Sequence, residues 1–82
     1  MNELTEKEAL LEGSGYRYHF DRMIYFNRAT RRALSLEFVA DHSFNEIQDL
    51  VDKQPPAANG WTFYFNEPPS DRIKRELAEV LD

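Results

Sequence analysis

Residues 16–35 read YRYHFDRMIYFNRATRRALS, and this stretch decides the fold. Apolar and polar side chains alternate through its first half, which is typical of a β-strand with one buried face. The alternation predicts a strand over residues 16–26. Its buried face should carry Tyr16, Tyr18, Phe20, Ile24 and Phe26.

A second strand, over about residues 32–39, should pair with the first as a hairpin. If the apolar faces of the two strands coincide, facing residues have the same parity and the loop has an odd number of residues. A three-residue loop, 29–31, would set Phe26 opposite Leu34. Because this loop has no glycine, Asn27 is the residue expected to adopt an unusual backbone angle.

A short helix is predicted before the first strand, over residues 5–12. Thr5 and Glu8 have the spacing of a capping box, and Gly13 is a natural helix end. Because two helical turns are marginal in water, this helix needs a surface to lie on. Residues 1–15 could therefore form a loosely attached helix and turn.

The second half of the chain predicts helix, loop, strand and helix. A capping box that starts at Ser43 introduces an amphipathic helix over residues 44–53. Two prolines make residues 54–60 a loop, and aromatic residues then alternate in a strand over 61–66. Ser70 should cap the last helix, whose apolar stripe is Ile73, Leu77, Val80 and Leu81.

These elements predict a single α+β domain over residues 1–82, in the order α-β-β-α-β-α. We expect a small, mainly antiparallel three-stranded sheet with helices packed on one face. The third strand should run parallel to the second, and the long first strand should lie at the centre. The expected core is Phe20, Ile24, Phe26, Leu34, Leu36, Phe38, Ile47, Leu50, Val51, Trp61, Phe63, Phe65, Ile73, Leu77 and Val80.

Charge is unevenly distributed along the chain. The net charge is −5, yet residues 16–35 carry five arginines and one acid, a local charge of +4. An acidic protein is repelled by nucleic acid, so a nucleic-acid contact would depend on these arginines alone. There is no cysteine, which excludes disulfides. Apolar runs are far shorter than a bilayer span, so we expect a cytoplasmic protein without a membrane partner.

The arginine-rich turn between the two predicted strands is the strongest candidate for a partner-binding site. Guanidinium groups bind carboxylates and phosphates through paired hydrogen bonds, and a hairpin tip presents them freely. We therefore expect an acidic protein surface to bind Arg28, Arg31 and Arg32, with Tyr25 beside them. In the competing interpretation these arginines are neutralised internally by Glu37, Asp41 or the helix over 44–53.

The first strand also offers a weaker catalytic candidate. His19 as acid or base, Arg17 as an anion clamp and Tyr25 as a donor could form a metal-independent hydrolase or nuclease. Cross-strand ion pairs on a solvated sheet face are the simpler interpretation, and we favour it. We expect no metal site and no cofactor, because two histidines without cysteine give a weak ligand set.

Together these features favour a small non-enzymatic protein-binding or regulatory module. A chain of 82 residues builds only a thin core, and association is one way to stabilise it. We expect a homodimer formed through an exposed strand edge or through the tyrosine-bearing face. The alternatives are a nucleic-acid-associated regulator that uses the arginine tip and, after it, the small enzyme.

Overall fold

The computed structural model describes residues 3–53 and 60–82 and confirms an α+β fold. The predicted loop over 54–60 lies, except for its last residue, outside these ranges. Within the described residues the order is α-β-β-β-α-α-β-α, with one more strand and one more helix than expected. The elements are α1 (Glu3–Gly13), β1 (Arg17–His19), β2 (Ile24–Asn27), β3 (Arg32–Ser35), α2 (Leu36–Asp41), α3 (Phe44–Asp52), β4 (Thr62–Tyr64) and α4 (Asp71–Leu81).

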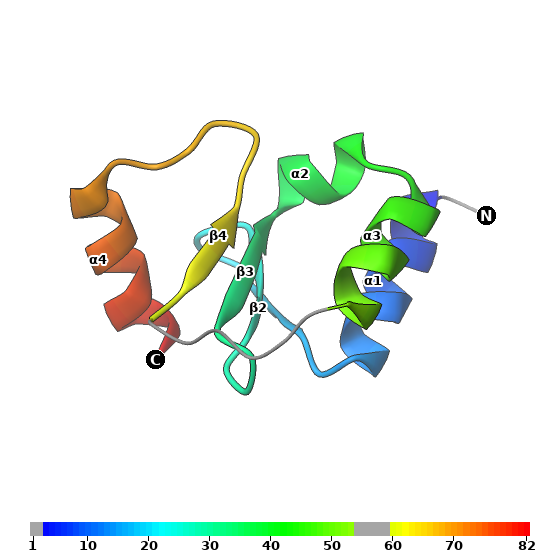
Figure 1. The fold of residues 1–82 in the computed structure, drawn as a ribbon, viewed down its shortest axis with the longest axis horizontal. Helices are drawn as coiled ribbons and strands as arrows, with labels where there is room; N and C mark the ends of the chain where they lie inside the picture. The colour runs from blue at the N-terminus through cyan, green and yellow to red at the C-terminus, as the bar shows by residue number, and fades with distance from the viewer. Residues whose placement is uncertain (1–2, 54–59) are drawn as a thin grey trace.

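The four strands form one mixed sheet in the order β1-β2-β3-β4. The pairs β1·β2 and β2·β3 are antiparallel. The pair β3·β4 is parallel, and the two arrows run in the same direction in Figure 1. The predicted parallel direction of the last strand is confirmed. The expectation that the first strand lies at the centre was wrong, because β2 and β3 are central and β4 lies beside β3.

The long strand expected over 16–26 is two strands, β1 and β2, joined by a turn over residues 20–23. Met23 takes a left-handed backbone angle, with φ of 56°. The chain folds back there, so that His19 faces Ile24. The turn also changes the parity of the pattern, and side chains that the alternation placed on one face lie on two. Phe20, expected in the core, is in the turn and 82% exposed.

The second hairpin, β2–β3, has a different register from the one predicted. Phe26 faces Ala33 and Tyr25 faces Leu34, which leaves a loop of four residues, 28–31, instead of three. Its left-handed residue is Arg31, with φ of 56°, and not Asn27. The apolar faces were not required to coincide as assumed, because both faces of this sheet are covered by helices.

The predicted strand over 32–39 ends at Ser35, where α2 begins. The Ser35 hydroxyl accepts a hydrogen bond from the backbone N–H of Phe38 at 3.1 Å, which caps the helix. The sequence carried this signal, since serine is a favoured N-cap residue. The apolar alternation over 34–38 hid it.

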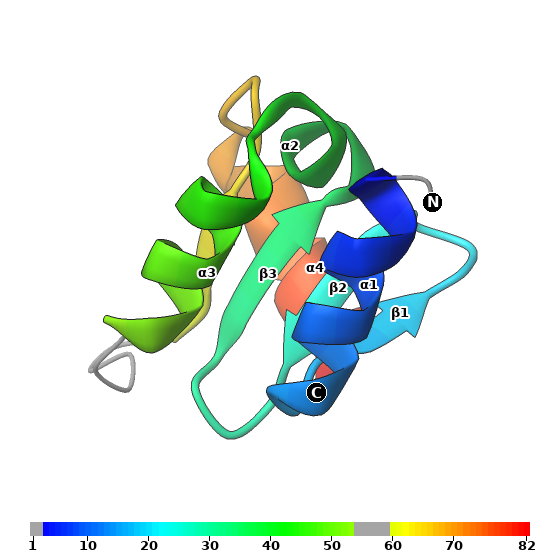
Figure 2. The same ribbon diagram turned by 90° about the vertical axis from the view of Figure 1, so that its right-hand side faces the viewer.

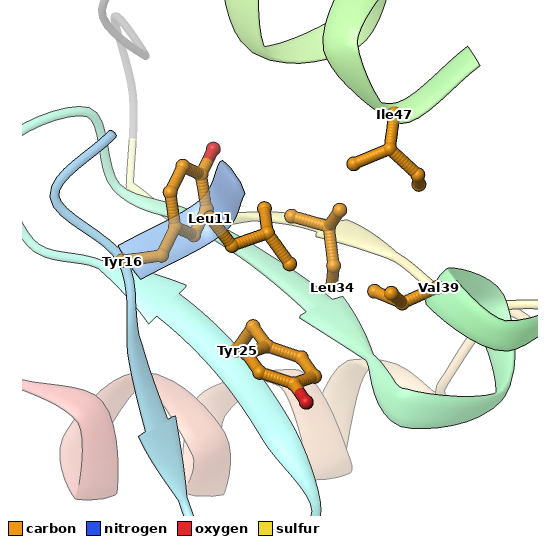
Figure 3. Close-up of a cluster of buried hydrophobic side chains, with 6 residues drawn as sticks. All are labelled: Leu11, Tyr16, Tyr25, Leu34, Val39 and Ile47. Carbon is orange, nitrogen blue, oxygen red and sulfur yellow. The ribbon is translucent and has the colours of Figure 1, made fainter. Parts of the chain in front are cut away.

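Helices cover both faces of the sheet, so the expectation of helices on one face was wrong (Figures 1 and 2). On one face, α4 packs Leu77 and Leu81 against β2 and β3. On the other, helices α1, α2 and α3 surround Tyr25 and Leu34 (Figure 3). Ile73 and Val80, both expected in the core, are 42% and 38% exposed. Leu81 is fully buried in their place.

The helix α1 begins before the predicted start, so Thr5 lies inside it and is not its N-cap. Its Leu11 is fully buried, and the ammonium of Lys7 is buried with it. Lys7 Nζ donates hydrogen bonds to the carbonyls of Val39 at 2.9 Å and Ala40 at 3.3 Å. These bonds satisfy carbonyls near the end of α2 and tie α1 to the domain.

The predicted caps of the two later helices are confirmed. Ser43 and Glu46 form the capping box of α3, and the Ser70 hydroxyl accepts from the Ile73 N–H at the start of α4. None of the helices in the described residues is long and apolar enough to cross a membrane.

Candidate protein interface

The three arginines of the β2–β3 turn do not form one exposed cluster. Arg28 Nε donates to the carbonyl of Leu81 at 2.8 Å, at the end of α4, and its guanidinium lies 5.4 Å from the Phe26 ring centre. Arg32 is buried; it donates to the Tyr64 hydroxyl and lies over the Tyr64 ring. Arg28 and Arg31 are both exposed, and Arg31 is the one whose side chain makes no hydrogen bond or ring contact within the described residues.

Tyr25, expected beside these arginines, is buried under α1 on the sheet face that Arg28 does not contact. Burial, and after it a hydrogen bond with the Glu8 carboxylate, raises the pKa of Tyr25 well above its usual value of 10.0. The phenol therefore stays protonated at neutral pH and bonds inside the protein. The protein encloses almost all of this side chain, and the small part that is left faces a hollow beside α1.

The three catalytic candidates are divided between the two faces of the sheet. Arg17 and His19 alternate with Tyr18 along β1, and they pair with Phe26 and Ile24 on the α4 side. Tyr25 belongs to the opposite face. The structure therefore does not bring the three groups together. Among residues 3–53 and 60–82, no cluster of three or more His, Cys, Asp or Glu side chains could hold a metal ion.

The largest exposed apolar side chain of the described residues is in the other turn, that of β1–β2. Phe20 is 82% exposed and Met23 is 53% exposed. Tyr18 lies beside them, with its ring centre 6.3 Å from that of Phe20 in an edge-on arrangement. We call Phe20, Arg22 and Met23 the hairpin tip. Exposed aromatic and methionine side chains next to arginine are typical of protein interfaces.

A hollow of about 240 Å³ opens between the β1–β2 hairpin and α1. Its apolar lining consists of Leu4, Leu36, Tyr18 and the edge of the buried Tyr25. Two carboxylates, those of Glu8 and Glu12, complete its wall. We call it the α1 hollow. It combines apolar surface with negative charge, whereas the turn beside it combines apolar surface with the guanidinium of Arg22 and, next to it, the carboxylate of Asp21.

Sequence reasoning missed this surface because it placed Phe20 in the core. One signal could have located the turn, since Arg22 interrupts the alternation and the aspartate before it, Asp21, is a residue favoured in turns. The hollow had no such signal, because it depends on how α1 lies across the sheet. No protein-family model, curated protein or solved structure matches this chain.

Proposed function

We propose that this protein is a small protein-binding module that acts as a two-fold homodimer. The observation that supports the proposal is the exposure of Phe20, 82%, beside a hollow lined by apolar side chains and carboxylates. Burying a phenylalanine side chain away from water is favourable by about 1.5–3 kcal/mol. A partner surface would supply that burial.

The hairpin tip and the α1 hollow complement each other. The tip projects an aromatic ring and a guanidinium, and the hollow offers leucine side chains and carboxylates. Both lie on the same part of the surface, since Tyr18 belongs to the hairpin and also lines the hollow. In a two-fold dimer each contact is made twice, so the tip of either copy would enter the hollow of the other.

The charges favour a second copy of this chain as the occupant. Arg22 is exposed on the tip, and Glu12 is exposed at the rim of the hollow. Two copies related by a two-fold axis would therefore form two arginine–glutamate pairs. β1 is an edge strand, and its outer backbone groups would lie at the border of the same contact.

Sedimentation equilibrium of the wild type and of a Phe20→Ser variant tests the proposal. We expect a dimer mass for the wild type at high micromolar concentration and a monomer mass for the variant. Ile73→Ser is the matched control, because Ile73 is an exposed apolar residue on α4, away from the tip. It should remain dimeric. A monomeric wild type, or a Phe20→Ser variant as dimeric as the wild type, would overturn the proposal.

A charge exchange tests the geometry of the contact. Arg22→Glu and Glu12→Arg should each weaken the dimer, because each places two like charges together. The double variant should restore association, since it only exchanges the two ends of the pair. Failure of the double variant to associate better than both single variants would contradict the arginine–glutamate contact.

A further inference from the structure

A second, larger hollow lies away from the hairpin tip, where α2 and α3 face the edge of the sheet at β4. Its volume is about 480 Å³, within the range of small-molecule sites. Ile47 and Leu50 from α3 give it apolar surface. Nothing in the proposed dimer contact uses it, because Tyr18 and α1 do not line it. We call it the β4 pocket.

Aromatic rings held in fixed orientations form one wall of the β4 pocket. The rings of Phe38 and His42 are stacked, with centres 3.9 Å apart and planes 24° apart. His42 Nδ1 donates to the Phe38 carbonyl at 2.8 Å, which fixes the imidazole. The Tyr64 ring lies 5.9 Å from that of Phe38. A wall of this kind favours a flat, aromatic ligand.

The buried cation among the residues that line the β4 pocket is Arg32, which donates a hydrogen bond to the Tyr64 hydroxyl. The two acids that line the pocket are engaged with their own helix. Glu46 Oε1 accepts from the Ser43 N–H in the capping box, and Asp49 pairs with Lys53 at 2.9 Å. The capping hydrogen bonds lower the pKa of Glu46, so this carboxylate stays ionised and bound to the helix end. A held guanidinium favours an anion at that point.

We propose that the β4 pocket binds a small planar aromatic molecule that carries a carboxylate or a phosphate. The ring lies against the Phe38–His42 stack and Tyr64. The anionic group reaches the guanidinium of Arg32, whose planar fork matches both carboxylate and phosphate oxygens. Lys53, exposed at the rim, adds positive charge at the entrance.

Four probes separate the two parts of this recognition. Naphthalene-2-carboxylate and 2-naphthyl phosphate carry both ring and anion, 2-naphthol lacks the anion, and cyclohexanecarboxylate lacks the aromatic ring. We expect the first two probes to shift the amide NMR signals of Leu50 and Tyr64. Their dissociation constants, taken from these shifts, should be at least about ten-fold lower than those of the last two probes. Comparison of the affinities of the two anionic probes shows whether the pocket prefers a carboxylate or a phosphate. Equal binding of 2-naphthol, or no shift with either anion, would overturn the proposal.

Two arginines of the same turn make a matched pair of variants. Arg32→Met should abolish the preference for the anionic probes, whereas Arg31→Met, at the exposed tip, should leave it unchanged. Arg32 is buried, so its variant must first show the wild-type circular dichroism. If that variant does not fold, the site is tested in the wild type instead, by nuclear Overhauser contacts between the protons of naphthalene-2-carboxylate and those of Phe38 or Leu50. Contacts elsewhere would contradict the site. None of these measurements depends on the dimer.

Discussion

The two hairpins of this sheet share β2 and have turns of equal length, yet their tips are opposite in character. Each turn spans four residues and contains one left-handed residue with φ of 56°, Met23 in β1–β2 and Arg31 in β2–β3. The arginine-rich turn is tied to the body of the protein, through Arg28 and through Asn27. The turn with the aromatic residue leaves Phe20 exposed to solvent.

The two turns differ in whether their side chains find partners within the same molecule. A guanidinium has five donors, and acceptors such as the free carbonyls at a helix end satisfy them within the same molecule. Arg28 does this at Leu81, the last residue of α4. An exposed phenyl ring cannot be satisfied by a hydrogen bond of this kind. Contact with water is unfavourable for it, and only burial against another apolar surface removes that cost. Exposed apolar surface is therefore more informative here than a high density of charge.

The largest expected effect comes from truncating a buried side chain at the centre of the sheet. Leu34 on β3 is fully buried between β2 and the helices of its face. Leu34→Ala should lower the free energy of unfolding by about 2–5 kcal/mol, measured by urea denaturation. Leu36→Ala should cost less, because Leu36 is only partly buried at the start of α2. A larger loss at Leu36 than at Leu34 would contradict the assigned register.

The second effect is specific to the tied-down turn. The Asn27 side chain accepts from the N–H groups of Ala29 and Thr30 and donates to the Ser14 carbonyl. Asn27→Ala should lower the free energy of unfolding by about 1–3 kcal/mol, because it leaves these groups without their partner. The control, Asp21→Ala in the exposed turn, should stay within about 0.5 kcal/mol of the wild type. Equal losses in both turns would remove the distinction between them.

A smaller effect appears only at alkaline pH. The raised pKa of Tyr25 means that the folded protein keeps this proton when the unfolded chain, with a pKa of 10.0, loses it. Stability due to this group is complete below pH 10.0 and falls as the pH rises from there toward the folded pKa. Tyr25→Phe should reduce that fall, in unfolding measured on both sides of this pH. An undiminished fall in the Tyr25→Phe variant would contradict the assignment to Tyr25.

The smallest expected effect is a difference in the free energy of unfolding between variants of Arg28 and of Arg31. Arg28→Ala removes the hydrogen bond to Leu81 and should lower the free energy of unfolding by about 0.5–1.5 kcal/mol. Arg31→Ala should change it by less than about 0.5 kcal/mol, because this side chain is exposed at the tip. Thermal unfolding of both variants checks the order. The reverse order would mean that Arg31, and not Arg28, holds the turn.

The parts of the fold that sequence predicted are those determined by neighbouring residues. The caps at Ser43 and Ser70 are local hydrogen bonds between residues three apart, so spacing was sufficient to find them. The register of the hairpins was not predictable in this way. Alternation identifies a face only when one face is solvated, and here α4 covers one face and α1 and α3 the other.

The candidate interface could be predicted only in part. The sequence drew attention to residues 16–35 as rich in arginine and aromatic residues, but it did not indicate which of these side chains the folded protein leaves exposed. The partner of Arg28 is 53 residues away along the chain, at Leu81, so no local pattern could reveal it. The exposure of Phe20 depended on the turn at Asp21, which the alternation concealed.

A dilution series of amide NMR spectra tests most directly whether the aromatic turn, and not the arginine turn, is the contact surface. With rising protein concentration, the signals of residues 18–23 and of Glu8 and Glu12 should shift together, because the proposed dimer would bury the tip and the hollow in the same contact. The signals of residues 28–31 should not move. Shifts confined to 28–31, or no shift in residues 18–23 up to high micromolar concentration, would contradict the account.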